Sequence, residues 1–164
     1  MSYSIVYSSQ TGNTKQLAET LRETLPQEGC RYFGTPAEAA AEADTLYVGF
    51  WTDKGTCDET IAAFLQGLAG KRVFLFGTAG FGGARAYFDQ ILASAAKNLP
   101  EGAVEIGRFM CQGKMQQAVR DRYVKMKAQP DAAPNLDQLI DNFDRALSHP
   151  DAADLENLRQ EILK

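Results

Sequence analysis

Hydroxyl and amide side chains are concentrated in residues 8–14, Ser-Ser-Gln-Thr-Gly-Asn-Thr, at the junction of two different sequence patterns. The apolar run before them, Tyr3–Ser8, predicts a strand, and leucines spaced four apart predict a helix over Thr14–Leu25. A helix N-terminus presents unpaired backbone N–H groups at the positive end of the helix dipole. The turn therefore predicts a phosphate site, with the candidate ligands Ser9, Gln10, Thr11, Gly12, Asn13 and Thr14.

Three other phosphate-handling folds do not fit this turn. A nucleoside-triphosphate loop needs Gly-Lys-Ser/Thr at its end, but Lys15 follows Thr14 instead of preceding it. A dinucleotide site needs three spaced glycines after the first strand, and only Gly12 is present. A phosphoacceptor domain needs carboxylates at the end of the first strand, where this chain has serines.

Two later loops have the composition expected around a flat aromatic ligand. The single tryptophan, Trp51, stands in the polar stretch Phe-Trp-Thr-Asp-Lys-Gly, and Phe81 stands among glycines after a strongly apolar run. An aromatic residue on a polar loop suits a stacking platform, although packing in the core is the alternative for Trp51. The candidate ring-binding residues are Phe50, Trp51, Thr52, Asp53, Lys54, Gly55, Thr78, Ala79, Gly80, Phe81, Gly82 and Gly83.

The elements that would position these loops alternate between strand and helix. Strands are expected at Tyr3–Ser8, Arg31–Phe33, Thr45–Phe50, Lys71–Gly77 and Ala103–Met110, and helices at Thr14–Leu25, Pro36–Glu42, Asp58–Leu68 and Ala84–Leu99. This alternation predicts a parallel sheet with helices on both faces, in one domain spanning residues 1–164. Residues 114–164 are expected to form a helical extension packed on that domain, with helices at Met115–Lys127, Leu136–Leu147 and Ala152–Leu163 and one of them covering the sheet.

The stretches Ser-x-Thr-Gly-Asn-Thr, Phe-Trp-Thr-Asp-Lys-Gly and Cys-Gln-Gly-Lys together resemble the flavodoxin family, in particular its short-chain members. The resemblance implies an α/β fold: a three-layer α/β/α sandwich whose five-stranded parallel sheet has the order 2-1-3-4-5. It also implies FMN as cofactor, with its phosphate in the first loop and its ring at the strand ends, near Cys111 and Gln112. In that family a peptide of the Lys54–Gly55 type reorients when the flavin is reduced, and Gly55 would tolerate both orientations.

Composition limits the setting in which the chain works. It has 164 residues, a net charge of -4, three cysteines and no apolar run long enough to span a membrane. We expect a cytoplasmic protein that binds neither nucleic acid nor membrane and holds no metal, with His149 in a structural role. Cys57 and Cys111 are interpreted as packing residues, and a redox pair is the alternative.

The function implied is electron transfer between redox partner proteins, a reductase donor and an acceptor enzyme, by a monomer or weak dimer. No catalytic acid, base or nucleophile is evident in the predicted cleft. The alternatives are an FMN-dependent NAD(P)H oxidoreductase and a non-redox interaction module that no longer holds flavin. Five basic residues and one acidic residue lie within 114–127, which suits either a solvated helix or a docking surface.

Overall fold

A computed structural model describes residues 1–82 and 84–164 of the chain. Its strands are β1 (Tyr3–Tyr7), β2 (Cys30–Gly34), β3 (Thr45–Asp53), β4 (Thr56–Cys57), β5 (Arg72–Ala79) and β6 (Val104–Gln112). Its α-helices are α1 (Asn13–Thr24), α2 (Glu59–Leu65), α3 (Arg85–Ala96), α4 (Gln117–Lys127), α5 (Leu136–Ala146) and α6 (Ala152–Ile162). The longest of these helices have 12 residues, and none has the apolar length of a membrane span.

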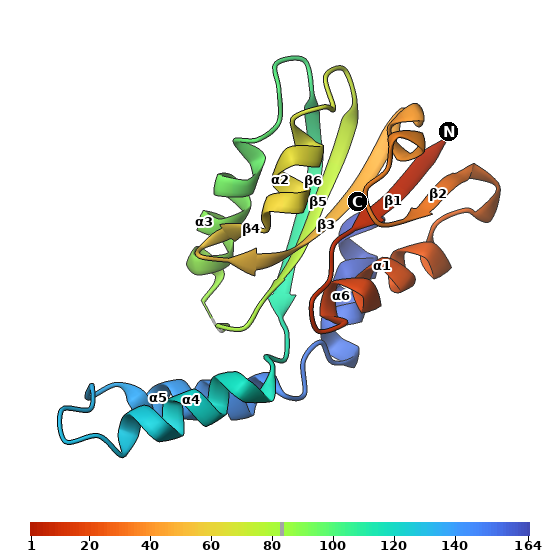
Figure 1. The fold of residues 1–164 in the computed structure, drawn as a ribbon. Coiled ribbons are helices and arrows are strands. Elements are labelled where there is room, and N and C mark those ends of the chain that lie inside the picture. Colours follow the sequence, from red (N-terminus) through yellow and green to blue (C-terminus); the bar gives the residue numbers. More distant parts are fainter. Residues whose placement is uncertain (83) are drawn as a thin grey trace.

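The sheet has the predicted topology. Its five long strands are parallel in the order β2-β1-β3-β5-β6, which confirms the flavodoxin-like order once the two-residue β4 is left out of the numbering. β4 pairs antiparallel with the end of β3 and forms a small hairpin that the sequence pattern does not predict. Helices α2 and α3 cover one face of the sheet, and α1 and α6 cover the other (Figure 1).

The core consists of two apolar layers, one on each face of the sheet. On one face, Val48, Phe50 and Leu75 pack with Ile61 and Ile91 of the covering helices, and all are buried. On the other face, Leu17 of α1 and Leu158 of α6 belong to a separate cluster with Phe76. Alternate residues of β5 thus serve opposite faces, as expected for a strand buried on both sides.

The helical extension is divided in space. Only α6 lies along the sheet, whereas α4 and α5 pack against each other as a hairpin that projects from the carboxyl edge of the sheet (Figure 1). Leu136, Phe143 and Ala146 of α5 are buried.

One predicted helix is wrong in type. Residues Pro36–Glu42 were expected to be α-helical, but the structure has a short 3₁₀ segment, η2, at Glu38–Glu42. Ala40 is the only buried residue of this segment, so little tertiary packing supports a full α-helix there, whereas the similarly short α2 buries Ile61 and Leu65.

Candidate functional site

A cleft of about 110 Å³ opens at the carboxyl ends of β1, β3 and β5, where the predicted loops meet. Ten of the predicted site residues line it, and they come from all three loops: Ser9, Gln10, Thr11, Asn13, Thr14, Trp51, Thr52, Thr78, Ala79 and Gly80. The position is the one where the strand order of a doubly wound sheet reverses, between β1 and β3.

The first loop is shaped by Gly12 and Ser9. Gly12 has φ +89°, a left-handed conformation that glycine adopts without strain, and it directly precedes α1. The Ser9 hydroxyl oxygen accepts hydrogen bonds from the N–H groups of Gly12 at 3.1 Å and Lys15 at 3.4 Å. The Ser9 hydroxyl oxygen therefore forms hydrogen bonds within the turn, which leaves less of its hydrogen-bonding capacity for a ligand.

Backbone donors remain available in this loop. Among the described residues, no acceptor pairs with the N–H groups of Thr11, Asn13 or Thr14. These groups precede or open α1, where the helix dipole favours a negative charge. The loop can therefore hold a phosphate through neutral main-chain donors.

Asn13 provides a specific test of what ligand fits. Its side-chain nitrogen donates to the Lys114 carbonyl oxygen at 2.8 Å, and the Thr11 hydroxyl donates to the same oxygen at 3.2 Å. The other end of the Asn13 amide, Oδ1, is buried and has no hydrogen-bond partner among the described residues. A buried acceptor of this kind calls for a donor, and a sugar-alcohol chain with hydroxyl groups, such as the ribityl chain of FMN, would supply one.

Thr14 connects the first loop to two strand ends. Its side chain is fully buried, and its hydroxyl donates to the Phe50 carbonyl oxygen at 3.0 Å and lies 3.1 Å from the Thr78 hydroxyl. The Thr52 hydroxyl in turn donates to the Thr78 carbonyl oxygen at 2.8 Å. These bonds hold the start of α1 and the ends of β3 and β5 in one arrangement around the cleft.

The second predicted loop is a tight hairpin. β3 pairs with β4 through Thr52–Cys57 and Asp53–Thr56, leaving Lys54 and Gly55 as the two turn residues, with φ +54° and +83°. Positive φ at both positions is typical of a type I′ hairpin turn. Lys54 and Gly55 are exposed, and neither they nor Asp53 lines the cleft.

Asp58 anchors this hairpin to the helix that follows. Its carboxylate accepts from the N–H of Trp51 and from the N–H of Ile61, both at 3.3 Å, and it caps α2. Burial raises the pKa of Asp58, and hydrogen bonds to its carboxylate oppose that rise. The carboxylate thereby ties Trp51 to the start of α2.

The third loop is held through Gly80. Its carbonyl oxygen accepts from Nε2 of Gln112 at 3.0 Å and from Nδ2 of Asn142 at 3.1 Å. Phe81 is 40% exposed beside it, and Gly82 lies under the Gln112 side chain, which a Cβ on Gly82 would approach to 2.5 Å. Gly83, also a predicted site residue, lies outside the described residues.

Phe50 and Cys111 are placed differently from a ligand-contacting side chain. The Phe50 side chain is fully buried in the cluster under α2 and α3, and Cys111 is 3% exposed in the cluster under α1 and α6. Only their main-chain atoms remain available to a ligand at the sheet edge. Cys57 belongs to the Phe50 cluster, so Cys57 and Cys111 lie on opposite faces of the sheet, which rules out a direct disulfide between them.

Four cleft residues were not among the predicted ligands: Lys114, Met115, Gln116 and Val119. Met115 lies against the third loop, and a Cβ on Gly80 would come within 2.5 Å of Met115 Cγ. The only feature of the sequence that could have indicated them is their position after the last strand, whose carboxyl end lies at the same edge of the sheet as the cleft. No local pattern indicated that the chain would turn back over the cleft there.

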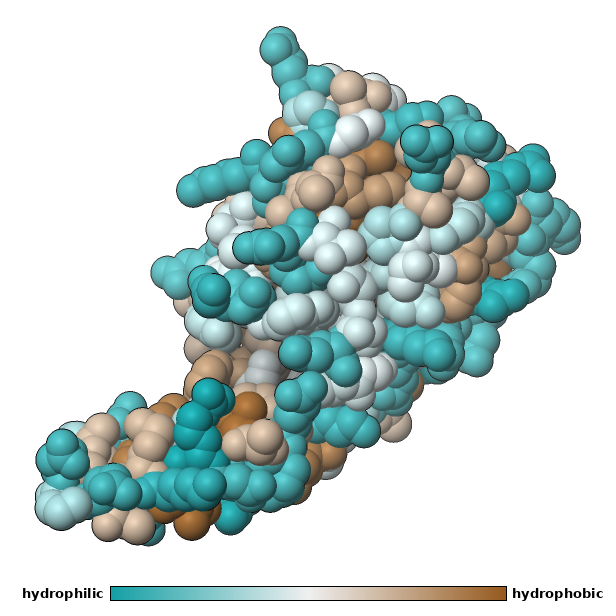
Figure 2. All heavy atoms as spheres, viewed as in Figure 1, coloured by the Kyte–Doolittle hydropathy of each residue, from teal (hydrophilic) through white to brown (hydrophobic). Residues whose placement is uncertain are grey.

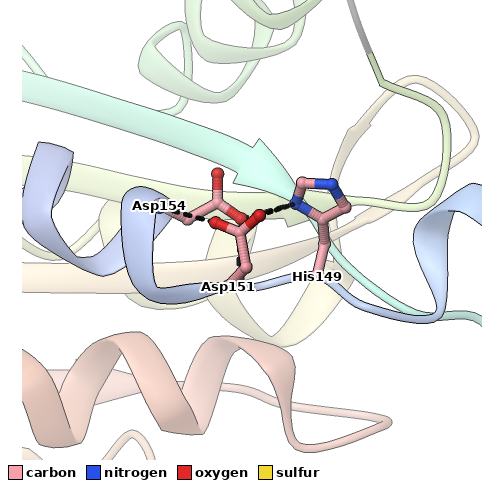
Figure 3. Close-up of side chains that lie close together, drawn as sticks. All are labelled: His149, Asp151 and Asp154. Atoms are coloured by element: carbon pink, nitrogen blue, oxygen red, sulfur yellow. Dashed lines mark hydrogen bonds and ion pairs between the residues drawn. The ribbon is translucent and has the colours of Figure 1, made fainter.

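A second polar group lies at the start of α6. Nδ1 of His149 is 2.6 Å from Oδ2 of Asp154, and Asp151 and Asp154 form a reciprocal capping box at the start of α6 (Figure 3). The side-chain atoms of these three residues that could ligate a metal ion lie within 4.8 Å of one another. Both carboxylates are engaged in capping the helix, and the His149 carbonyl oxygen accepts from the Lys114 N–H at 3.0 Å. The group therefore joins α6 to the segment that borders the cleft.

Comparison with known proteins agrees with this geometry. A family model described as the flavodoxin domain matches residues 4–163. The chain is 48% identical to the flavodoxin-like domain-containing protein BilS of Clostridium symbiosum, covering 94% of this chain and 90% of that protein. It is 30% identical to BilS of Clostridioides difficile, covering 92% and 88%. Among solved structures, a flavoprotein from Lactobacillus acidophilus in complex with FMN shares the fold with a TM-score of 0.51, at 14% identity and covering 67% of this chain and 93% of the other.

Proposed function

This chain belongs to the flavodoxin family, and on that premise we propose that it carries electrons between redox proteins through a bound FMN. FMN is the cofactor of this family, and the residues of the cleft suit it. The first loop offers main-chain donors for the phosphate, Asn13 offers a buried acceptor for a hydroxyl, and Trp51 offers an aromatic surface for the ring. When bound, FMN supplies the one- and two-electron chemistry.

One observation about the cleft favours a carrier over an enzyme that uses acid–base or nucleophilic chemistry of its own side chains. Among the described residues that line it, Lys114 is the only one with an ionisable side chain. Substrate turnover usually relies on a positioned acid, base or nucleophile, and hydroxyl, amide and apolar groups predominate here. The protein's part is then to bind the cofactor, orient it and expose it to a partner.

The partner we propose is a redox protein that docks over the carboxyl edge of the sheet. Phe81 is exposed there, and Val124 and Met126 are 46% and 44% exposed on the neighbouring α4. Figure 2 shows hydrophobic and hydrophilic residues side by side on the projecting hairpin. A small surface of this mixed kind suits a brief encounter better than a permanent complex.

The charge of α4 is smaller in the structure than its sequence implies. Arg120 pairs with Asp144 at 2.9 Å, and Lys127 pairs with Asp137, so α5 neutralises part of the basic segment. Among the described residues, Lys114, Arg122 and Lys125 have no carboxylate partner. These three cations would steer an acidic partner surface, with a strength that falls as salt increases.

An anaerobic titration of the FMN-loaded protein with NADH and NADPH, followed by visible absorption, tests the proposal. A carrier stays oxidised with either nucleotide and bleaches when dithionite or a separate reductase is added. Rapid bleaching by a nucleotide alone would contradict the carrier role and establish the oxidoreductase alternative. A protein that cannot be loaded with FMN would instead be a non-redox module.

A further inference from the structure

The Gly80 carbonyl sits at the centre of a closed hydrogen-bond triangle. Nε2 of Gln112 donates to it at 3.0 Å, Nδ2 of Asn142 donates to it at 3.1 Å, and Nε2 of Gln112 also donates to Oδ1 of Asn142 at 3.2 Å. Gln112 ends β6, whereas Asn142 comes from the middle of α5. Two elements from distant parts of the chain therefore hold one peptide group.

This arrangement determines the orientation of the third loop. With two donors, both lone pairs of the Gly80 oxygen are used, and the planar trans peptide then fixes the direction of the Phe81 N–H, opposite to the carbonyl. Gly80 and Gly82 give the loop itself little conformational restraint. The loop that borders the cleft is thus held by side chains outside it.

The position of Asn142 is set by the packing of the hairpin. Phe143 and Ala146, its neighbours on α5, are fully buried, and Asn142 itself is half-buried. Met115, just before α4, contacts the same loop at Gly80, and Val119 of α4 lines the cleft. α4 therefore lines the cleft through Val119, and α5 reaches a cleft residue, Gly80, through the hydrogen bond from Asn142.

We propose that Asn142 is a positioning residue for FMN and that the α4–α5 hairpin is thereby part of the cofactor site. Asn142 holds the Gly80–Phe81 peptide in the orientation that the flavin ring meets. Binding of FMN and packing of the hairpin then support each other, because each favours the same arrangement of residues 78–82. This inference depends on FMN binding and does not depend on the carrier role.

The test compares two variants of α5 that undergo the same chemical change. Asn142→Leu keeps the approximate size of the side chain and removes both hydrogen bonds, and Gln138→Leu makes a comparable change at an exposed position of the same helix. FMN affinity is measured by quenching of flavin fluorescence, and the midpoint potentials of the bound flavin by equilibration with reference dyes. We expect the Kd of Asn142→Leu to rise about 3- to 10-fold with a shift in potential, and that of Gln138→Leu to stay within about twofold.

The midpoint potential of the bound flavin distinguishes a positioning role of Asn142 from a role in stability alone. If Asn142 served only to stabilise the fold, Asn142→Leu would melt at a lower temperature without FMN while the potential of the bound flavin stayed at the wild-type value. That result, or a Kd equal to that of Gln138→Leu, would overturn the proposal.

If Asn142→Leu fails to fold, hydrogen exchange on the wild-type protein tests whether FMN binding is coupled to packing of the hairpin. Amides of residues 136–147 should exchange several-fold more slowly with FMN than without it, whereas those of α6, already packed on the sheet, should not change. Equal exchange of 136–147 with and without FMN would reject the coupling.

Discussion

The side-chain amide of Asn13 joins the start of α1 to the segment after β6, donating at 2.8 Å to the carbonyl oxygen of Lys114, 101 residues along the chain. Gly113 makes this contact possible, because a Cβ at that position would collide with the Asn13 amide. The opposite atom of the same amide, Oδ1, is buried and finds no partner in the part of the chain that the structure describes. Asn13 thus combines a structural bond with an acceptor that only a ligand or solvent can satisfy.

Asn13→Ala should separate cofactor binding from stability. Removing the side chain loses the bond to Lys114 but also removes a buried unpaired acceptor, so the free energy of unfolding without FMN should change by less than about 1 kcal/mol. The Kd for FMN should rise about tenfold because the hydroxyl partner is lost. Fluorescence titration and urea unfolding measure the two quantities. An unchanged Kd, with exposed Gln16→Ala as control, would show that Asn13 does not contact the cofactor.

Thr14 and Thr78 should be energetically coupled. Thr14→Val keeps the shape of the side chain but leaves the Phe50 carbonyl oxygen without its donor and the Thr78 hydroxyl without its neighbour. We expect Thr14→Val and Thr78→Val each to lower the free energy of unfolding by about 1–2 kcal/mol. The double variant should lower it by less than the sum of the two single effects.

Urea unfolding of the four proteins without FMN gives this double-mutant cycle. Thr20→Val is a matched control, because the Thr20 hydroxyl bonds only to the Gln16 carbonyl of its own helix, at 3.1 Å. Its effect should be small, since such a local bond adds little to helix stability. Strictly additive losses for Thr14 and Thr78 would mean that their 3.1 Å contact contributes nothing.

The order of the sheet could be predicted because each strand is an apolar run bounded by turn residues. The lengths of β3 and β5 could not, since apolar character ends near Phe50 and Gly77 while pairing continues through Trp51–Thr78 and Thr52–Cys57. These extra pairs are made by polar and mixed residues whose strand conformation depends on the partner chain segment. Residues expected in loops, including Trp51 and Thr78, are consequently held on strands.

The sequence pattern also could not predict where the helices of residues 114–164 pack. The apolar stripe of α5, with Leu136 and Phe143, shows that one face must be buried but not what buries it. A sheet and a second helix satisfy that stripe equally well. For the same reason Met115 and Val119 could not be assigned to the cleft, because their contribution depends on where α4 lies.

The buried thiols should be unreactive in the folded protein. Burial, with smaller contributions from Asp154 and Asp151, raises the pKa of Cys111 well above its usual range, and burial also raises the pKa of Cys57. Because the thiolate is the nucleophile, iodoacetamide at pH 8 should modify half-buried Cys30 first and leave Cys111 unmodified until denaturant is added. Peptide mass spectrometry measures this, and rapid native labelling of Cys111 would contradict it.

The same pKa shift has a consequence for stability at high pH. Above the ordinary thiol pKa, near 8.5, the unfolded chain releases the Cys111 proton while the folded chain retains it. Since the folded state then binds more protons, stability should fall as pH rises from about 8 to 10. Cys111→Ala should lose stability through its cavity but show a flatter slope over this range. An unchanged slope would mean that Cys111 ionises equally in both states.

Lys114 should raise the reduction potential of the bound flavin. Lys114 lines the cleft, and reduction of FMN adds negative charge there, which a nearby ammonium group stabilises. At separations of about 6–10 Å, the interaction is worth about 0.4 kcal/mol in a water-like dielectric and up to about 2.8 kcal/mol in that of a protein surface, or roughly 20–120 mV for one electron. Lys114→Gln should therefore make the more reducing couple more negative by that amount.

Lys97→Gln is the control for this measurement, since Lys97 is also an exposed lysine but follows α3 at the opposite edge of the sheet. Its potential should match the wild type. The difference between the two variants should shrink in high salt, because an exposed charge is screened beyond about 10 Å at 0.1 M and about 3 Å at 1 M. A potential for Lys114→Gln equal to that of Lys97→Gln at low salt would place the Lys114 charge outside the reach of the flavin.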